Sequence, residues 1–360
     1  MRLELVRRAE PSRLMVFLSP LIAVALTVVT GFVIFTAFGV DPFEALFVFF
    51  VEPLTAQWSL EELVIKATPI VLVAIGLSIC FLSNTWNIGA EGQLIAGAIF
   101  GSIPPIFFPE WQGPLILPAM ILMGILGGML YSAIPAVLKV RFGANEILTS
   151  LMLVYVAQLL LDYLARGPWR NPEGHNFPDS RPFDGDQLLP DLFGTNIPSS
   201  IMFAIVAVFV VGFVMRSTIT GFQVRVIGEA PRAGAFAGFS RNRMILFAFV
   251  FAGGFAGLAG VSEVAGPIGQ LRISVSPGYG FTAIIVAFLG RLNPFGILIA
   301  GFVLALTFLG GEGAQIMLGL PEQMTRVFQG MLLFYVLACD TFIHYRLRTR
   351  KVPAAATAEA

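Results

Sequence analysis

The chain has 360 residues, of which 57% are hydrophobic and only 12% are charged. This balance lies far outside that of an average soluble domain, so the composition indicates an integral membrane protein. The formal net charge is zero and gives no basic footprint for nucleic acid, so no nucleic-acid partner is expected. The two cysteines, Cys80 and Cys339, lie in apolar runs and are too few for a zinc site, and no metal site is expected.

A basic N-terminus precedes the first apolar stretch. Residues 14–38 form an apolar run, and the arginines before it are Arg2, Arg7, Arg8 and Arg13. The run of about 25 residues is too long for the hydrophobic region of a cleaved signal peptide and has the length of a spanning helix. We therefore expect a retained first span.

Nine further apolar stretches follow, near 62–82, 93–110, 114–138, 146–165, 198–215, 243–263, 280–291, 294–311 and 325–345. Two of them are weak as straight spans. The stretch 93–110 contains Pro104 and Pro105, and 280–291 has barely half of the roughly 20 residues that a span needs. Irregular backbone survives at membrane depth only beside protein or water. The prediction is an all-α integral membrane protein with about ten transmembrane helices, some broken or short.

Basic residues in alternate loops predict the orientation. With a cytoplasmic N-terminus, the inner loops and the end of the chain hold Lys139, Arg141, Arg216, Arg225, Arg232, Arg241, Arg243, Arg291, Arg346, Arg348, Arg350 and Lys351. The expected organisation is one polytopic domain over 1–345, with both termini cytoplasmic. Within and after it we expect an extracytoplasmic loop at 166–198, a cytoplasmic loop at 216–243 and a cytoplasmic tail at 346–360.

The predicted extracytoplasmic loop, 166–198, is rich in proline and polar residues. Two interpretations stay open for it. It is either an ordered external cap that offers a docking surface, or a flexible loop that the fold tolerates.

The predicted cytoplasmic loop, 216–243, contains the segment IGEAPRAGAFAG. Glu229 near the start, Pro231 in the first turn, alanines beyond it and Gly238 near the end predict a short helix over 229–238. A stiff amphipathic helix on the membrane face can serve as a binding site for another protein. On composition alone, an ordinary loop between two spans is an equally good interpretation.

Several stretches together resemble one family. VRVIGEAPRAGAFAGFSRNR looks like the coupling segment of ABC-transporter permeases of the nucleoside, ribose and branched-chain amino-acid superfamily. NTWNIGAEGQLIAGA is similar to the Asn-Ile-Gly-x-Glu-Gly-Gln signature of the nucleoside and simple-sugar branch, and it is the specific signal. GANEILTSLMLVY, PGYGFTAIIVAFLGRLNPFGILIAG and LPEQMTRVFQGMLLF resemble further parts of that branch, so the resemblance runs from about Leu60 to Leu337.

The resemblance implies the permease subunit of an ATP-driven importer in a bacterial-type inner plasma membrane. A nucleoside or related purine compound, or else a simple sugar, is the implied cargo. The implied partners are an ABC ATPase subunit, a second permease that is the same or a related chain, an extracytoplasmic substrate-binding protein, and membrane lipid. The resemblance implies that the residues which couple this chain to the ATPase are Gly228, Glu229, Pro231, Arg232, Ala235 and Gly238.

The chain shows no motif for chemistry of its own. It contains no phosphate-binding Gly-x-x-x-x-Gly-Lys-Ser/Thr loop, no His-Glu-x-x-His and no Gly-x-Ser-x-Gly. His175 and His344 fall in a polar loop and at a helix end, where a solvated role is typical. We therefore expect a transport subunit that is not an enzyme and binds no cofactor, with ATP hydrolysed by a partner subunit.

One dense polar cluster interrupts the early spans, and it consists of Asn84, Trp86, Asn87, Glu91 and Gln93. An ionisable group inside a membrane indicates a functional site, and these side chains could bind a sugar hydroxyl or a base edge in a translocation pathway. The alternative is that they support a helix break around Gly89 and Gly92. Three other charges within spans, Lys66, Asp162 and Asp340, lie near helix ends and are expected to snorkel.

Small residues recur at helix-packing spacing in Gly97-x-x-x-Gly101, Gly124-x-x-x-Gly128 and Gly253-x-x-x-Gly257. Such pairs let two helices approach closely. We expect them to pack within the chain rather than to form a dimer face.

Two other classes of membrane protein stay open as alternatives. An ion-coupled secondary transporter of a small polar solute would need its own coupling-ion site and an internal repeat, and the two halves show only weak likeness. A membrane-embedded enzyme would need paired catalytic groups. The chain also departs from the family at Thr282, where the family usually has Asp in Gly-Phe-Asp-Gly-Ile-Ala.

Overall fold

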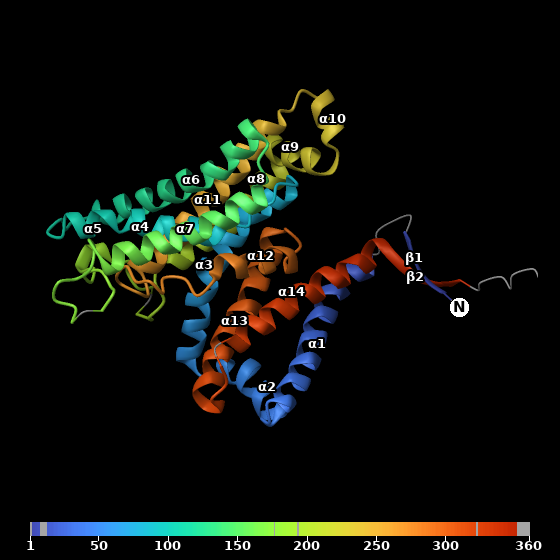
Figure 1. Ribbon diagram of the computed structural model, residues 1–360, viewed down its shortest axis with the longest axis horizontal. Coiled ribbons are helices and arrows are strands. Elements are labelled where there is room, and N and C mark those ends of the chain that lie inside the picture. The colour runs from blue at the N-terminus through green and yellow to red at the C-terminus, as the bar shows by residue number, and fades with distance from the viewer. Residues whose placement is uncertain (1, 8–12, 176, 193, 322, 351–360) are drawn as a thin grey trace, which may run out of the picture.

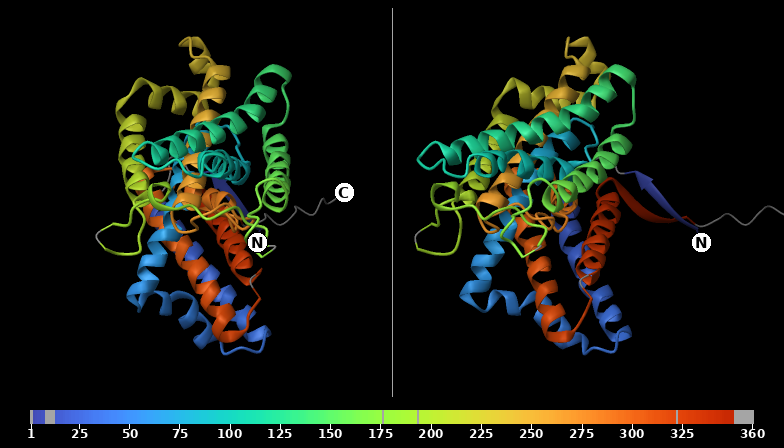
Figure 2. Two further views of the ribbon diagram at one scale, coloured as in Figure 1. Left: turned by 90° about the vertical axis from the view of Figure 1, so that its left-hand side faces the viewer. Right: turned by 60° about the vertical axis from the view of Figure 1, so that its left-hand side comes forward.

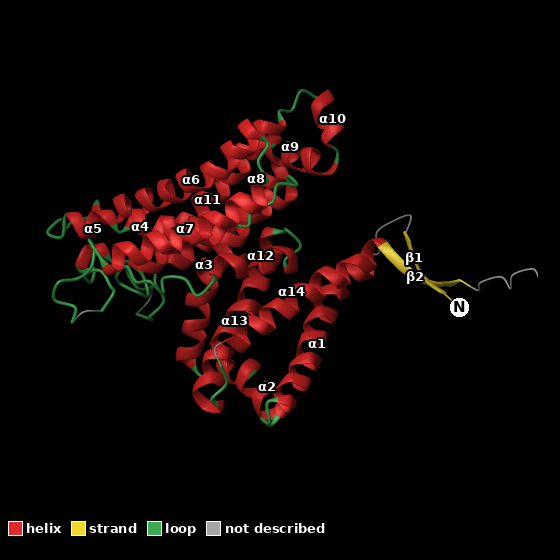
Figure 3. Cartoon of the chain, viewed as in Figure 1, coloured by secondary structure: helices red, strands yellow, loops and turns green. Residues whose placement is uncertain are grey.

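The computed structural model describes residues 2–7, 13–175, 177–192, 194–321 and 323–350. Helices make up most of this part of the chain (Figures 1 and 3). In chain order the elements are β1 (Arg2–Arg7), α1 (Arg13–Ala37), α2 (Pro42–Phe50), η1 (Glu52–Leu54), α3 (Gln57–Leu82), α4 (Ala90–Gly101), α5 (Ile103–Phe107), α6 (Ile116–Phe142), α7 (Glu146–Arg166), η2 (Gly185–Gln187), α8 (Ser200–Ser217), α9 (Ile219–Glu229), α10 (Pro231–Phe236), α11 (Arg241–Ala265), α12 (Tyr279–Leu289), α13 (Pro294–Leu318), α14 (Gln323–His344) and β2 (Tyr345–Arg350).

Eight helices within the described residues are long and apolar enough to cross a membrane: α1, α3, α6, α7, α8, α11, α13 and α14. The two stretches that are weak in the sequence form shorter helices. Residues 93–110 contribute to α4 and α5, of 12 and 5 residues, and 280–291 lies in α12, of 11 residues. Eight of the ten expected spans are thus long helices among the described residues, and the two stretches expected to be broken or short fold as short helices.

α3 is the central helix of the bundle. It is apolar on all sides, and every residue from Ala67 to Cys80 is buried, as a helix without a polar face requires. One group of helices, α4, α6, α7 and α11, packs together on one side of α3, where α11 touches it directly. On the other side α12 and α13 contact α3, and α1, α2 and α14 complete the second group (Figure 1).

Glycines permit the tight packing of the first group. Gly257 of α11 faces Gly97 of α4, and it also faces Gly124 and Gly128 of α6. A side chain at Gly257 would meet the backbone of Gly128 at 3.1 Å, closer than a methyl group normally approaches backbone. The small-residue motifs therefore pack against one another within the chain, and this prediction is confirmed.

The two ends of the bundle differ in structure. α9 and α10 lie between the end of α8 and the start of α11 and project from one end (Figures 1 and 2). Three arginines from α8, α9 and the turn after α12, namely Arg216, Arg225 and Arg291, line one small cavity at this end. At the other end, the long segment 167–199 lies over the last turn of α11, since the N–H of Leu189 donates to the carbonyl of Ala265 at 2.7 Å.

The segment 167–199 is an ordered cap in the part that the structure describes. Its later part is tied to the start of α3, to the turn before α6 and to the segment 269–272 by four contacts between Ser180 and Asn196. The bonded pairs are Asn196 to Glu61 at 2.9 Å, Gly113 to Asp186 at 2.7 Å, Ser180 to the Leu271 carbonyl at 2.9 Å, and Phe183 to the Gly269 carbonyl at 2.8 Å. These bonds favour the ordered-cap interpretation for the described residues of 180–196.

The described bundle is all-helical, which confirms the all-α prediction, and a short two-stranded ribbon lies outside it. β1 pairs with β2 in an antiparallel ribbon, with Arg2 opposite Arg350 and Arg7 opposite Tyr345. Residues 346–350 of the predicted cytoplasmic tail thus belong to a strand, while 351–360 lie outside the described residues. The alternation in RLELVR, period two rather than helical, is the sequence signal for β1.

Replacing Gly257 by alanine should lower the free energy of unfolding by about 1–3 kcal/mol, because the added methyl group overlaps the backbone of α6. Gly313→Ala in α13 is the matched control, since its methyl group would make an ordinary 3.6 Å contact with Val48. Both native cysteines are buried, so a thiol-reactive dye in detergent reports the unfolding midpoint. Equal midpoints for the two variants would contradict the packing described here.

Candidate functional site

α9 connects the projecting end of the bundle to α3. The Nη2 atom of Arg225 donates to the carbonyl of Met215 at 2.6 Å, which folds α9 back onto the end of α8. Gly228 lies directly against the carbonyl oxygen of Leu82, the last residue of α3, and leaves no space for a side chain. α9 is thereby in rigid contact with the central helix.

α10 is a separate helix that begins at Pro231. Ala230 has φ −139° and ψ 67°, so α9 and α10 are not continuous, since the residue before a proline avoids helical conformation. The predicted helix over 229–238 is therefore wrong at its start, and Glu229 is the last residue of α9. At the other end Gly238 has φ +80°, the left-handed conformation that ends a helix.

α10 is exposed on nearly all of its surface, and among its residues only Gly234 is buried. The ring of Phe236 is 94% exposed, although sequence reasoning did not single it out. Its signal is a large aromatic residue isolated among small residues in AGAFAG. The predicted coupling residues all lie at this end: Gly228 is half-buried, and Glu229, Pro231, Arg232, Ala235 and Gly238 are exposed.

Asn84 lies in the turn after α3, at the surface, away from the buried members of the predicted polar cluster. Its φ of +52° is a left-handed conformation that asparagine tolerates, and its side-chain oxygen accepts a 3.3 Å bond from Trp86 Nε1. The Trp86 ring stacks on Phe288 of α12 with centroids 6.0 Å apart. The structure therefore separates Asn84 from Asn87, Glu91 and Gln93.

Asn87 and Gln93 bind each other across the break between α3 and α4. Each amide donates to the other at 3.0 Å, and both side chains are buried. The Asn87 oxygen also accepts the N–H of Gly89, the N-cap residue of α4, at 3.0 Å. These bonds join the extended segment to the first turn of α4 and satisfy polar groups that have no access to water.

Glu91 lies where two helices begin. α12 starts directly against the first turn of α4, and a side chain at Gly280 would lie 2.5 Å from the Glu91 Cα atom, so the approach requires glycine. The Glu91 Oε2 atom accepts the N–H of Gly280 at 2.6 Å, and the residue is only 1% exposed. Its carboxylate thus sits at two helix N-termini, where aligned peptide dipoles favour negative charge.

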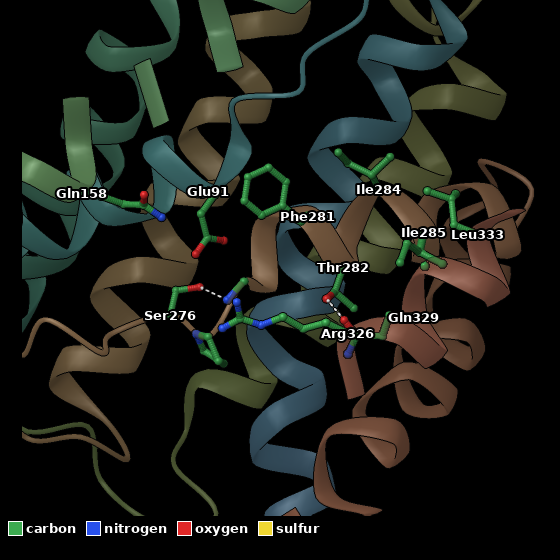
Figure 4. A pocket seen from close by; sticks show the side chains of 13 residues that line it. Glu91, Gln158, Ser276, Phe281, Thr282, Ile284, Ile285, Arg326, Gln329 and Leu333 are labelled. Atoms are coloured by element: carbon green, nitrogen blue, oxygen red, sulfur yellow. Dashed lines mark hydrogen bonds between the residues drawn. The ribbon is translucent and has the colours of Figure 1, made fainter. Parts of the chain in front are cut away.

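A cavity of about 400 Å³ lies beside Glu91 (Figure 4). Its walls come from α4, α7, the segment before α12, α12 and α14, and its lining residues are Glu91, Gln158, Ser276, Pro277, Gly278, Phe281, Thr282, Ile284, Ile285, Arg326, Gln329, Gly330 and Leu333. Ser276 and Arg326 face the Glu91 carboxylate, and Thr282 donates to Gln329 at 3.1 Å. Polar groups and apolar faces in a space of this size suit a small polar molecule. We call this space the inner cavity.

A second cavity, of about 160 Å³, adjoins the first, and we call it the outer cavity. It is lined by Pro277, Phe308, Gly311, Glu312, Gln315, Thr325 and Arg326. Glu312 is bound at 2.9 Å by Lys66 of α3. Lys66 thus has a partner 246 positions away in sequence, and Glu312 is 53% exposed, so the expectation that Lys66 snorkels toward a helix end stays a prediction.

Three further acidic residues lie within the predicted spans. Asp162 pairs with Arg166 at 2.7 Å on the exposed face of α7, and the side chain of Asp340 lies outside the described residues. Glu263 of α11, which the sequence analysis did not single out, is buried. Among the described residues, no group of three or more His, Cys, Asp or Glu is placed to hold a metal ion.

Comparison of the sequence with known proteins places the chain in a family. Residues 59–337 match the family described as the permease component of branched-chain amino acid transport systems. The chain is 35% identical to a glucose ABC transporter permease protein of Haloferax volcanii, covering 98% of this chain and 96% of that protein. It is 27% identical to a nucleoside ABC transporter permease protein of Lactococcus lactis, covering 89% and 90%, and 25% identical to a guanosine ABC transporter permease protein of Bacillus subtilis, covering 76% and 80%. No solved structure matches the chain.

The chain belongs to this permease family, which confirms the resemblance seen in its motifs. It is a permease subunit of an ABC importer and a multi-pass protein of the plasma membrane.

Replacing Gln93 by leucine should lower the free energy of unfolding by about 1–3 kcal/mol, because it leaves the buried Asn87 amide without its partner. Asn87→Leu should cost more, since Gly89 then loses its acceptor as well. The control is Asn84→Asp, an exposed change that keeps an acceptor for Trp86. Thermal unfolding in detergent measures all three, and a Gln93→Leu protein as stable as the wild type would show that the amide pair does not support the break.

Proposed function

We propose that this chain forms the membrane path of an ABC importer for a neutral polyhydroxylated compound, a nucleoside or a simple sugar. Its proposed partners are an ABC ATPase that docks on α10, a second permease subunit that is the same or a related chain, and an extracytoplasmic substrate-binding protein. The chain itself binds no ATP in this proposal. The observation that carries it is the exposed α10, joined through α9 to the central helix at Gly228 and Leu82.

The proposed orientation places α9 and α10 in the cytoplasm and the segment 167–199 outside. The clustering of Arg216, Arg225 and Arg291 at the α9–α10 end supports it, because basic residues are retained on the cytoplasmic side. With this orientation the chain crosses the membrane ten times. Eight crossings are the long helices, and two combine extended backbone with α4 and with α12.

α10 has the properties expected of a contact that transmits movement. Phe236 and Arg232 present an aromatic ring and a guanidinium, the residue types that contribute most to protein interfaces. The absence of space between Gly228 and Leu82 means that a displacement of α9 must displace the end of α3. ATP-driven closure of the ATPase would therefore reach the helices around the inner cavity.

The inner cavity supports the proposed cargo class. The relatives described above carry glucose, nucleosides or guanosine in their names, and these compounds share an uncharged part rich in hydroxyl groups. Amides, hydroxyls and one carboxylate line the polar side of the cavity, and all of them bind hydroxyl groups. Phe281, Ile284 and Leu333 provide apolar surface for the carbon faces of a sugar or a base.

The proposed orientation predicts how single cysteines react in sealed right-side-out vesicles. A membrane-impermeant maleimide should label Phe177→Cys directly and Phe236→Cys only after permeabilisation, because these exposed residues lie at opposite ends of the bundle. The native thiols are buried and should stay unlabelled. The reverse labelling pattern would invert the orientation.

Docking of the ATPase on α10 is tested by affinity purification in mild detergent followed by mass spectrometry. An ATPase should be recovered in stoichiometric amount with the wild type, and its recovery should fall at least about 10-fold with Phe236→Asp or Arg232→Glu. Phe177→Asp, an equally drastic change of an exposed phenyl group at the other end, is the control. Undiminished recovery with Phe236→Asp would refute docking on α10.

A further inference from the structure

The outer and inner cavities share a wall. Two residues, Pro277 and Arg326, line both of them. Pro277 belongs to the segment before α12, and Arg326 lies in the first turn of α14. These two side chains therefore form part of the wall between the two cavities.

The two cavities follow one another along the bundle. The outer cavity is lined by Glu312 and Gln315 near the end of α13 and by Thr325 near the start of α14. The inner cavity continues along α14 to Gln329 and Leu333, about one and two turns beyond Arg326. Arg326 thus separates a space near the helix ends from a space deeper in the bundle.

The charges in the two linings are arranged around Arg326. Each cavity has one carboxylate, Glu312 in the outer and Glu91 in the inner, and among the described lining residues Arg326 alone is basic. Glu312 pairs with Lys66, while Glu91 accepts the N–H of Gly280 and is also faced by Ser276 and Arg326. Charges of both signs therefore lie close together in the two linings, so an ion of either sign meets attraction from one group and repulsion from another.

A guanidinium has a specific use for a polyhydroxylated cargo. Its N–H groups form a rigid planar fork that can donate two parallel bonds to adjacent oxygens, whereas a lysine ammonium is a point charge without this geometry. Two neighbouring hydroxyl groups on a sugar ring present such a pair of oxygens. Figure 4 shows the long Arg326 side chain reaching from α14 across the inner cavity toward Ser276 and Glu91.

We propose that Arg326 is the residue that selects cargo between the outer and inner cavities, by donating paired hydrogen bonds to two adjacent hydroxyl groups. This inference rests on the proposed function, from which it takes the cargo class. It adds a selectivity step inside the membrane path, separate from any selection by an extracytoplasmic protein.

The test is equilibrium binding of radiolabelled guanosine and 2′-deoxyguanosine to the purified transporter complex, without its extracytoplasmic protein and without ATP. The two probes differ by one hydroxyl group of an adjacent pair. The wild type should bind guanosine about 10- to 100-fold more tightly than 2′-deoxyguanosine, and Arg326→Lys should reduce this ratio to near one.

The control is Arg166→Lys, because Arg166 is an exposed arginine of α7 that pairs with Asp162. It should leave the ratio unchanged. A structural role for Arg326 would weaken both probes equally and lower the unfolding midpoint measured with the thiol-reactive dye, and that result would overturn the proposal. Wild-type protein that binds guanosine and 2′-deoxyguanosine equally well would overturn it as well. Loss of ATPase recovery bears only on the proposed function, since the binding measurement uses no ATP.

Discussion

The structure depends on satisfying backbone groups where two helices begin inside an apolar bundle. α4 and α12 both start within the protein, and each start leaves N–H groups that lipid cannot satisfy. Glu91 meets part of this demand by accepting the N–H of Gly280, and the Asn87 oxygen accepts that of Gly89. The same arrangement brings a carboxylate to the edge of a cavity, so helix support and a polar binding surface arise from one set of residues.

The surrounding packing makes this arrangement possible. Glycine contacts fix α4, α6 and α11 as one tight block, and α3 lies between that block and the second group of helices. The cavities lie at the junction, where α12 and α14 of the second group meet the start of α4. Because α9 touches α3 at Gly228 without intervening space, the junction is mechanically continuous with the end of the bundle that carries α10.

The sequence was informative where a property is local. Apolar length predicted the eight long spans, glycine spacing predicted packing within the chain, and Pro231 predicted the start of a short helix. It could not divide the polar cluster into an exposed Asn84, an amide pair and a cavity-facing Glu91, because Gly280, 189 positions away, supplies the deciding contact. The pairing of Lys66 with Glu312 was equally hidden from the sequence, because the two residues are 246 positions apart. Likewise, no local pattern brings Arg326 beside Pro277 of another segment.

The exposure of Phe236 has a consequence for assembly in the cell. A phenyl ring left in water forgoes about 1.5–3 kcal/mol that burial would provide, and Phe236 is almost fully exposed. If α10 is the docking site proposed above, each newly inserted copy presents this ring to the chaperones and proteases that act on unburied apolar surface until the ATPase binds. Copies made in excess of that subunit would keep Phe236 uncovered and would be degraded sooner. The chain would therefore accumulate only when the two subunits are made in matched amounts.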